Sequence, residues 1–125
     1  MKIKCLKILD PNTGKELESS SSLTVGKEYV VLSIHVEDRD NTKFQILRDD
    51  HTPSFHNANQ FEVISSKIPN TWQIDFIPKS YLSLGPKAWS RPGFWDDYFD
   101  GDPEAEAIFD REKEVMFSEE SGADK

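Results

Sequence analysis

The fold is decided by residues 23–36, which read LTVGKEYVVLSIHV. The second half of this stretch, Val30–Val36, is rich in β-branched and apolar residues, which favour a strand over a helix. Gly26 and Lys27 ahead of it do not form a phosphate loop, because the upstream glycine and the following Ser or Thr of that motif are missing. We therefore expect Val30–Val36 to be the central strand of an antiparallel sheet.

Shorter strands are predicted on both sides of this run. Upstream, lysines alternate with apolar residues over Lys2–Leu9, which is typical of a strand with one exposed face. A turn at residues 11–14 and a serine-rich loop at residues 18–22 follow. Downstream, a polar hairpin loop at residues 37–42 and a turn at residues 49–53 separate further strands, which we place at 44–47, 54–55, 61–64 and 72–76.

The C-terminal quarter has helical patterns instead. Short helical turns are predicted at residues 86–89 and 92–99, each opened by a proline. Asp102-Pro103-Glu104 is a strong helix start, because Asp caps free amides and Pro suits the first helical position. The helix that follows carries its apolar residues at one face, namely Ala105, Ile108, Phe109 and Met116.

The stretch 23–64 resembles small SH3-like barrels. The resemblance rests on the opening Leu23-x-Val25-Gly26-Lys27-x-Tyr29-x-Val31, the hairpin strand Phe44-x-Ile46, the Asp49-Asp50 turn and the closing Phe61-x-Val63. It implies a mainly β, α+β fold: a small SH3-like antiparallel β-barrel followed by short C-terminal helices. Within one domain we expect an N-terminal strand and loop at 1–22, the barrel at 23–78, a helical cap at 79–117 and a disordered tail at 118–125.

The chain has 125 residues, of which 36% are hydrophobic and 30% are charged. This length is typical of one domain and suffices for a core without a metal or a disulfide. The single cysteine, Cys5, excludes an internal disulfide and fits a reducing compartment. No apolar run approaches the ~20 residues of a membrane helix, and the first residues lack the apolar core of a secretory signal. We expect a cytoplasmic protein with no membrane partner, either a monomer or a weak dimer.

The net charge of −8 lies almost entirely in the last quarter of the chain. Residues 1–93 carry a net charge of +1, whereas residues 94–125 carry −9. An acidic balance opposes direct binding to the phosphate backbone of a nucleic acid. Runs of acids are usually solvated helix faces, but they also serve as landing surfaces for basic partners.

Side chains suited to catalysis or metal binding are few and scattered. Three histidines, His35, His51 and His56, match no common zinc-ligand spacing, and Cys5 has no histidine near it in sequence. Adjacent carboxylates are plentiful, but neighbours on a short helix point in different directions, unlike the facing pair of a glycosidase. We predict no catalytic residue, no metal and no cofactor. A small hydrolase or metal-dependent enzyme is the third alternative, which convergence of Asp49, His51 and His56 in a deep cleft would favour.

Aromatic residues cluster within eleven positions, at Trp89, Phe94, Trp95, Tyr98 and Phe99. Two interpretations stay open. The rings either clamp the C-terminal helices onto an open face of the barrel, or they form an interface hot spot within an acidic rim. The two interpretations are compatible if Trp89 packs inward while Trp95 or Tyr98 is presented outward.

The segment 89–105 looks like the C-terminal part of small bacterial proteins, on the pattern Trp89-x-x-Pro92-Gly93-Phe94-Trp95-x-x-Tyr98-Phe99-x-Gly101-Asp102-Pro103-x-Ala105. In general character the chain is similar to immunity proteins that neutralise toxins in bacterial competition, which are short, acidic and devoid of catalytic motifs. This resemblance implies a non-catalytic module whose partner is a basic toxin domain. The aromatic and acidic residues that we expect to bind this partner are Trp95, Asp96, Asp97, Tyr98, Asp100, Asp102, Glu104 and Glu106.

If the toxin is a nuclease, these acids would occupy its phosphate-binding surface and block the access of substrate. The alternative function is that of a housekeeping or phage-derived SH3-like adaptor, which binds a peptide or protein in a groove of the barrel. Under that alternative the aromatic cluster belongs to the core, and replacing the acids leaves partner binding intact.

Overall fold

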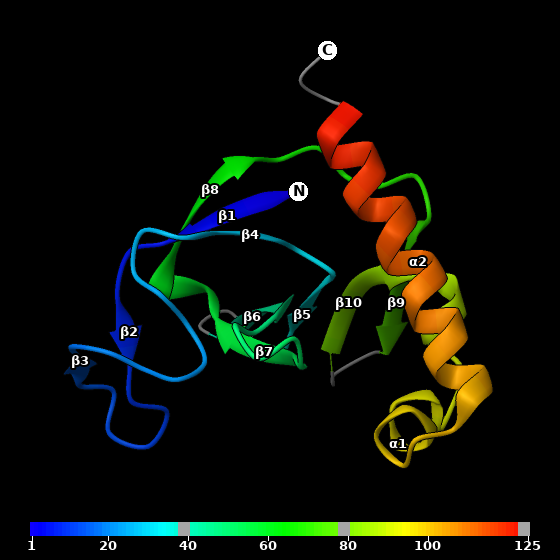
Figure 1. Ribbon diagram of the computed structural model, residues 1–125, viewed down its shortest axis with the longest axis horizontal. Coiled ribbons are helices and arrows are strands. Elements are labelled where there is room, and N and C mark those ends of the chain that lie inside the picture. Colours follow the sequence, from blue (N-terminus) through cyan, green and yellow to red (C-terminus); the bar gives the residue numbers. More distant parts are fainter. Residues whose placement is uncertain (38–40, 78–80, 123–125) are drawn as a thin grey trace.

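The computed structural model describes residues 1–37, 41–77 and 81–122. Its strands form two antiparallel sheets and a separate short hairpin, and two α-helices follow at the C-terminal end (Figure 1). The mainly β, α+β fold expected from the sequence is therefore confirmed, with antiparallel sheets ahead of the C-terminal helices.

The two sheets pack around a common core, and each has a simple strand order. The first sheet, in the order β4-β1-β8, consists of β1 (Lys2–Cys5), β4 (Glu28–Val30) and β8 (Phe61–Ser65). The second, in the order β7-β6-β5-β10-β9, consists of β5 (Ser33–Val36), β6 (Thr42–Leu47), β7 (Pro53–Asn57), β9 (Trp72–Ile77) and β10 (Tyr81–Pro86). The remaining short elements are the hairpin β2 (Ile8–Leu9) with β3 (Glu16–Leu17), and the 3-10 helix η1 (Ala58–Gln60).

The expected single strand over residues 30–36 is wrong, because the chain crosses from one sheet to the other inside it. Val31 and Leu32 lie between β4 and β5 and are fully buried. The amide of Val31 donates a hydrogen bond to the carbonyl of Met1 and so extends the pairing of the first sheet. The amide of Leu32 instead donates to the carbonyl of Gln45 in the second sheet. The apolar run thus supplies the bend that connects the two sheets.

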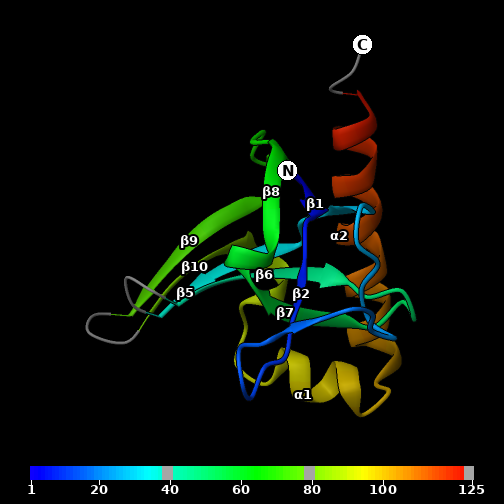
Figure 2. The ribbon, with the colours of Figure 1, turned by 90° about the vertical axis from the view of Figure 1, so that its left-hand side faces the viewer.

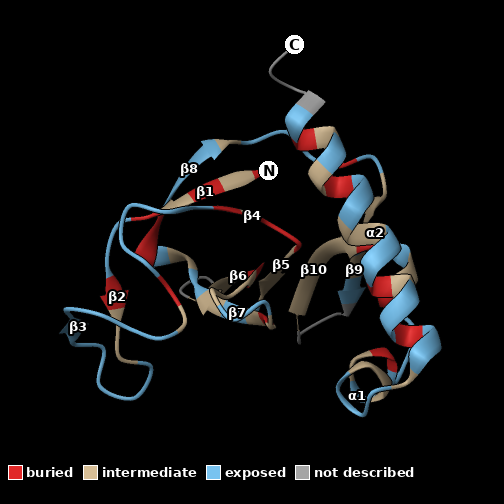
Figure 3. Ribbon diagram, in the orientation of Figure 1, coloured by how far each residue is buried: buried red, intermediate tan, exposed pale blue. Residues whose placement is uncertain are grey.

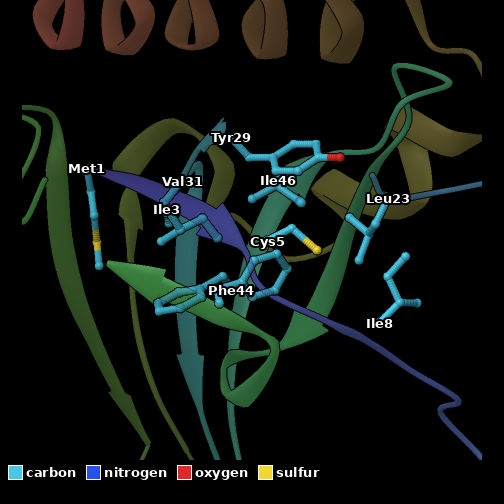
Figure 4. Close-up of a cluster of buried hydrophobic side chains, with 10 residues drawn as sticks. Met1, Ile3, Cys5, Ile8, Leu23, Tyr29, Val31, Phe44 and Ile46 are labelled. Carbon is cyan, nitrogen blue, oxygen red and sulfur yellow. The ribbon is translucent and has the colours of Figure 1, made fainter. Parts of the chain in front are cut away.

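The barrel core is built from alternate residues of the strands (Figure 4). Ile3 and Cys5 point into it and are fully buried, whereas Lys2 and Lys4 are only partly buried. The expected strand over residues 2–9 is interrupted after Cys5, where the amides of Leu6 and Lys7 both donate to the carbonyl of Gln60. Cys5 is therefore a small apolar core residue, as the alternation predicted.

Strand β10 was not predicted, and it lies inside the segment expected to be helical from residue 79. It pairs with β5 on one side and β9 on the other, so that the β9–β10 hairpin widens the second sheet (Figure 2). The sequence pattern of β10 is clear in retrospect. Leu82 and Leu84 alternate with Tyr81 and Ser83, and proline ends the strand.

The helical segment begins with the 3-10 helix η2 (Lys87–Trp89) and continues with α1 (Phe94–Phe99) and α2 (Pro103–Gly122). The buried residues of α2 lie along one face, and its outer face is exposed (Figure 3). Ala105, Phe109 and Met116 are the apolar residues buried on that face, which confirms the predicted helical spacing.

Residues 118–122 are helical, so the expected disordered tail is wrong up to Gly122. Contacts to the barrel hold this end of α2. The Glu120 carboxylate lies 2.7 Å from the amino group of Met1, and both are buried. Glu119 accepts a hydrogen bond from the amide of Asn70. The last three residues lie outside the described residues. Among the described residues, no helix combines the length and apolarity of a membrane span.

Candidate protein-binding surface

Local sequence signals fix both helices that carry the predicted binding residues. Gly93 precedes α1 with φ of 79° and Gly101 follows it with φ of 83°, a backbone conformation that glycine adopts without strain. Asp102 Oδ2 then accepts the amide hydrogen of Ala105 at 3.1 Å, which is the predicted cap of α2. Helix α1 and the first turn of α2 therefore form one corner of the molecule (Figure 1).

Most of the aromatic cluster is core. Trp89 is 5% exposed and stacks on Phe109 of α2 with ring centroids 5.0 Å apart. Trp95 packs edge-on against Trp89 at 5.5 Å, and Tyr98 lies 4.8 Å from Phe109. These contacts join η2, α1 and α2, and Leu32 and Trp72 of the sheet region pack in the same cluster, which supports the clamp interpretation. Trp95 and Tyr98 remain partly accessible, but the ring that protrudes is Phe99, with 59% of its surface exposed.

The six predicted acids fall into two groups. Asp97 and Asp102 have structural partners, since Asp97 lies 2.9 Å from the Arg91 guanidinium and Asp102 caps α2. The other four carry exposed or largely exposed carboxylates and form no ion pair with any described residue; we call them the acidic surface, and they are Asp96, Asp100, Glu104 and Glu106.

The neighbouring face of α2 continues this negative charge. Burial raises the pKa of the Tyr98 hydroxyl, and the nearby carboxylates of Asp110 and Glu106 raise it further. Tyr98 also packs against Phe109 of α2, which places α1 beside these acids. Between residues 94 and 122 the basic residues are Arg111 and Lys113, and Lys113 lies near Asp110 and Glu114. The corner thus keeps a strong negative potential.

A groove, which we did not predict, opens beside the acidic surface. It has a volume of about 390 Å³ and lies between the outer face of the second sheet and the segment from η2 to α1. The residues that shape it come from both sides, namely Ser33, His35, Phe55, Asp75, Tyr81, Ser83 and Gly85 from the sheet, and Trp89, Ser90, Arg91, Trp95 and Asp96 from the helical segment. We call this cavity the groove.

Small residues at its floor explain why the groove exists. Ser33, Ser83 and Gly85 lie close together on β5 and β10, and their small size leaves room for the groove above them, although Ser33 already fills the space next to Gly85. A Cβ atom at Gly85 would lie only 3.0 Å from Cβ of Ser33. The groove was not predicted because part of its lining comes from β10, and the sequence pattern did not predict a strand there.

No family model, curated protein or solved structure matches the chain. The acidic surface and the groove are therefore interpreted from the chemistry of their own residues.

The residues considered for catalysis do not converge. Asp49 accepts hydrogen bonds from Thr24, Lys27 and Tyr29, whereas His51 is exposed in the turn that follows, with φ of 67°. His56 lies on β7 with its Nε2 2.8 Å from the hydroxyl of Ser54. The feature that would have favoured an enzyme, a cleft uniting Asp49, His51 and His56, is absent from the described part of the chain.

The other candidate positions have structural surroundings. His35 lies on β5 between the rings of Tyr81 and Phe55, at centroid distances of 4.7 and 5.8 Å. Burial raises the pKa of the Cys5 thiol, which opposes formation of a reactive thiolate. Across residues 1–37, 41–77 and 81–122, no group of three or more His, Cys, Asp or Glu side chains is placed to hold a metal ion.

Proposed function

We propose that this chain is a non-catalytic protein-binding module whose acidic surface engages a basic protein, and that this partner is a toxin that the module neutralises. The observation that carries the proposal is the exposure of four carboxylates at one corner without an ion-pair partner among the described residues. Unpaired, solvent-facing charges of one sign attract an oppositely charged partner and accelerate its association.

The corner has the other attributes of an interface. Phe99 protrudes next to Asp100 and offers an apolar contact within the acidic rim. Helix α1 is held rigidly by the packing of Trp95 and Tyr98, so little conformational entropy is lost on binding. A nuclease toxin needs a basic surface for phosphate, and an acidic module seated there would exclude the nucleic acid.

The test compares two variants of equal charge. Asp100→Asn, Glu104→Gln and Glu106→Gln together neutralise three acids of the surface. Glu16→Gln, Glu18→Gln and Glu62→Gln together neutralise three exposed acids elsewhere. Each triple variant is co-expressed with the product of the neighbouring gene, the candidate toxin, and growth and co-purification are measured.

We expect the wild-type chain and the control triple variant to bind and protect. The surface triple variant should bind about tenfold more weakly at low salt, since each rim charge contributes up to ~1 kcal/mol. Absence of binding by the wild-type chain would contradict the proposal, and so would equal binding by both triple variants.

The groove favours one second candidate, the adaptor that binds a peptide on the barrel. A peptide could bind in the groove next to α1 without contacting Asp100, Glu104 or Glu106, because these residues do not line it. Under this alternative the surface triple variant retains partner binding, whereas substitutions that fill the groove abolish it.

A further inference from the structure

We infer that the groove receives an arginine side chain of the basic partner, an inference that rests on the proposed function. The groove and the acidic surface are continuous, because Asp96 belongs to both and Trp95 lines the groove from the same helix. A partner attracted by the acidic surface would therefore bring its basic residues to the mouth of the groove.

The groove walls match the chemistry of a guanidinium group. Arginine is planar, donates up to five hydrogen bonds, accepts none and stacks on aromatic rings. The groove offers carboxylate acceptors from opposite walls, Asp75 on β9 and Asp96 on α1. It also offers the aromatic rings of Tyr81 and Trp95 as stacking surfaces.

Charge within the groove favours a cation over an anion. Arg91 is the one lysine or arginine among the described lining residues, and its charge is balanced by Asp97 at 2.9 Å. Its guanidinium also lies over the Phe94 ring, 5.4 Å from the centroid. The carboxylates of Asp75 and Asp96 therefore dominate the potential, and they would repel a phosphate or carboxylate ligand.

The floor suits a long, flat side chain. Ser33, Ser83 and Gly85 are small lining residues that take up little of the groove, and the two serine hydroxyls add hydrogen-bond acceptors. Ser33 already donates to Gln45 at 2.7 Å, which leaves its oxygen free to accept. Arginine can use several acceptors at once, whereas a lysine ammonium is a single point of charge.

The test follows the three tryptophan indole N–H signals by nuclear magnetic resonance. The probes are the peptides acetyl-Gly-Arg-Gly-amide and acetyl-Gly-citrulline-Gly-amide, which differ in charge but hardly in shape. Trp89 and Trp95 line the groove, whereas Trp72 does not line it and its indole N–H is already donated to Met116. We expect the arginine peptide to shift the signals of Trp89 and Trp95, leave that of Trp72 in place, and bind at least tenfold more tightly than the citrulline peptide.

Two variants locate the binding. Asp75→Asn should weaken binding of the arginine peptide about tenfold, and Ser83→Leu should abolish it by filling the floor, while Glu62→Gln on the first sheet leaves it unchanged. The spectrum of each free variant establishes that it is folded. Equal shifts with both peptides, or unshifted Trp89 and Trp95 signals, would overturn the inference.

The same variants separate this inference from the proposed function. If the surface triple variant loses the toxin but Asp75→Asn binds it as the wild type does, the groove inference is overturned and the proposed function stands. If the arginine peptide occupies the groove while the surface triple variant still binds the toxin fully, the groove inference is supported and the proposed acidic surface fails.

Discussion

Asp49 joins two segments of the barrel that lie more than twenty residues apart, through side-chain hydrogen bonds. Its carboxylate accepts from the Thr24 hydroxyl at 2.7 Å, the Lys27 ammonium at 2.7 Å and the Tyr29 hydroxyl at 2.9 Å. The turn after β6 is thereby tied to the segment that leads into β4. Tyr29 is buried, and this burial with the nearby carboxylate raises the pKa of its hydroxyl to about 12.

Replacing Asp49 should therefore be costly. Asp49→Asn removes the charge that these three donors share, and we expect the free energy of unfolding to fall by about 1.5–3 kcal/mol. Asp50→Asn in the same turn is the matched control, because Asp50 is exposed and pairs with Arg48 at the surface. Its loss should be clearly smaller than that of Asp49→Asn, because a solvent-exposed ion pair contributes little to stability. Urea unfolding measures both, and equal losses would contradict the role assigned to Asp49.

The same carboxylate predicts a pH dependence. Hydrogen bonds from Lys27, and then from Thr24 and Tyr29, hold the pKa of Asp49 below its ordinary value. A lowered folded-state pKa stabilises the fold above the unfolded-state pKa, and this contribution is lost as the pH falls through the folded-state value. The stability difference between wild type and Asp49→Asn should therefore be constant near neutrality and shrink in acid, as unfolding at a series of pH values would show. A difference that grows in acid would contradict this assignment.

At the residue scale, the sequence predicted local chemistry better than distant contacts. The expected turn at residues 49–53 is present, and Asp50 accepts the amide hydrogen of Thr52 as an aspartate in a turn does. Asp49 instead bonds to Tyr29, twenty positions away. No spacing rule encodes such a contact. The same limit applies to the predicted acids, because the Arg91–Asp97 ion pair depends on how the chain enters α1.

At the element scale, the docking of α1 onto α2 depends on one ring. Phe109 is 2% exposed and contacts Trp89, Trp95 and Tyr98. Phe109→Ala should lower the free energy of unfolding by about 3–5 kcal/mol, because it leaves a cavity beneath the cluster. Phe99→Ala should change it by less than ~1 kcal/mol, since Phe99 is mostly exposed. Thermal unfolding of both variants tests the clamp, and similar losses would count against it.

The pairing of β5 with β10 makes a second prediction at this scale. A Cβ added at Gly85 meets Cβ of Ser33 at 3.0 Å, and neither atom moves without its strand. Gly85→Ala should therefore destabilise the fold by about 1 kcal/mol or more. Ser33→Gly should recover part of this loss in the double variant, although it also removes the hydrogen bond to Gln45. Additive losses in the double-mutant cycle would show that the two positions do not interact.

Elements were predictable where a sequence pattern corresponded to a single helix or strand. The cap at Asp102 and the apolar face of α2 are present as predicted, because a helix buries one face along its whole length. The run Val30–Val36 serves two sheets, and periodicity alone cannot reveal a bend between Val31 and Leu32. Strand β10 was missed because its glycine and its proline, Gly85 and Pro86, also suit a loop before a helix. The groove was therefore not predicted either, because β10 provides part of its lining.

At the scale of the whole molecule, a barrel of nearly balanced charge carries a strongly acidic helical corner. Asp97, Asp102 and Glu120 are acids of this part with structural partners. Asp100, Glu104 and Glu106 have no ion-pair partner among the described residues, so their mutual repulsion opposes folding slightly. Acids that bind a partner, rather than hold the fold, should be dispensable for stability.

This distinction gives the last prediction. The surface triple variant Asp100→Asn, Glu104→Gln and Glu106→Gln should change the free energy of unfolding by less than ~1 kcal/mol, because relieved repulsion offsets the loss of Glu104 near the start of α2. Asp102→Ala should cost about 1 kcal/mol through the lost cap, although it removes only one charge. Urea unfolding at low and high salt measures both variants. A loss above ~2 kcal/mol in the triple variant would mean that the acids hold the fold, and the acidic surface would then need no partner to explain it.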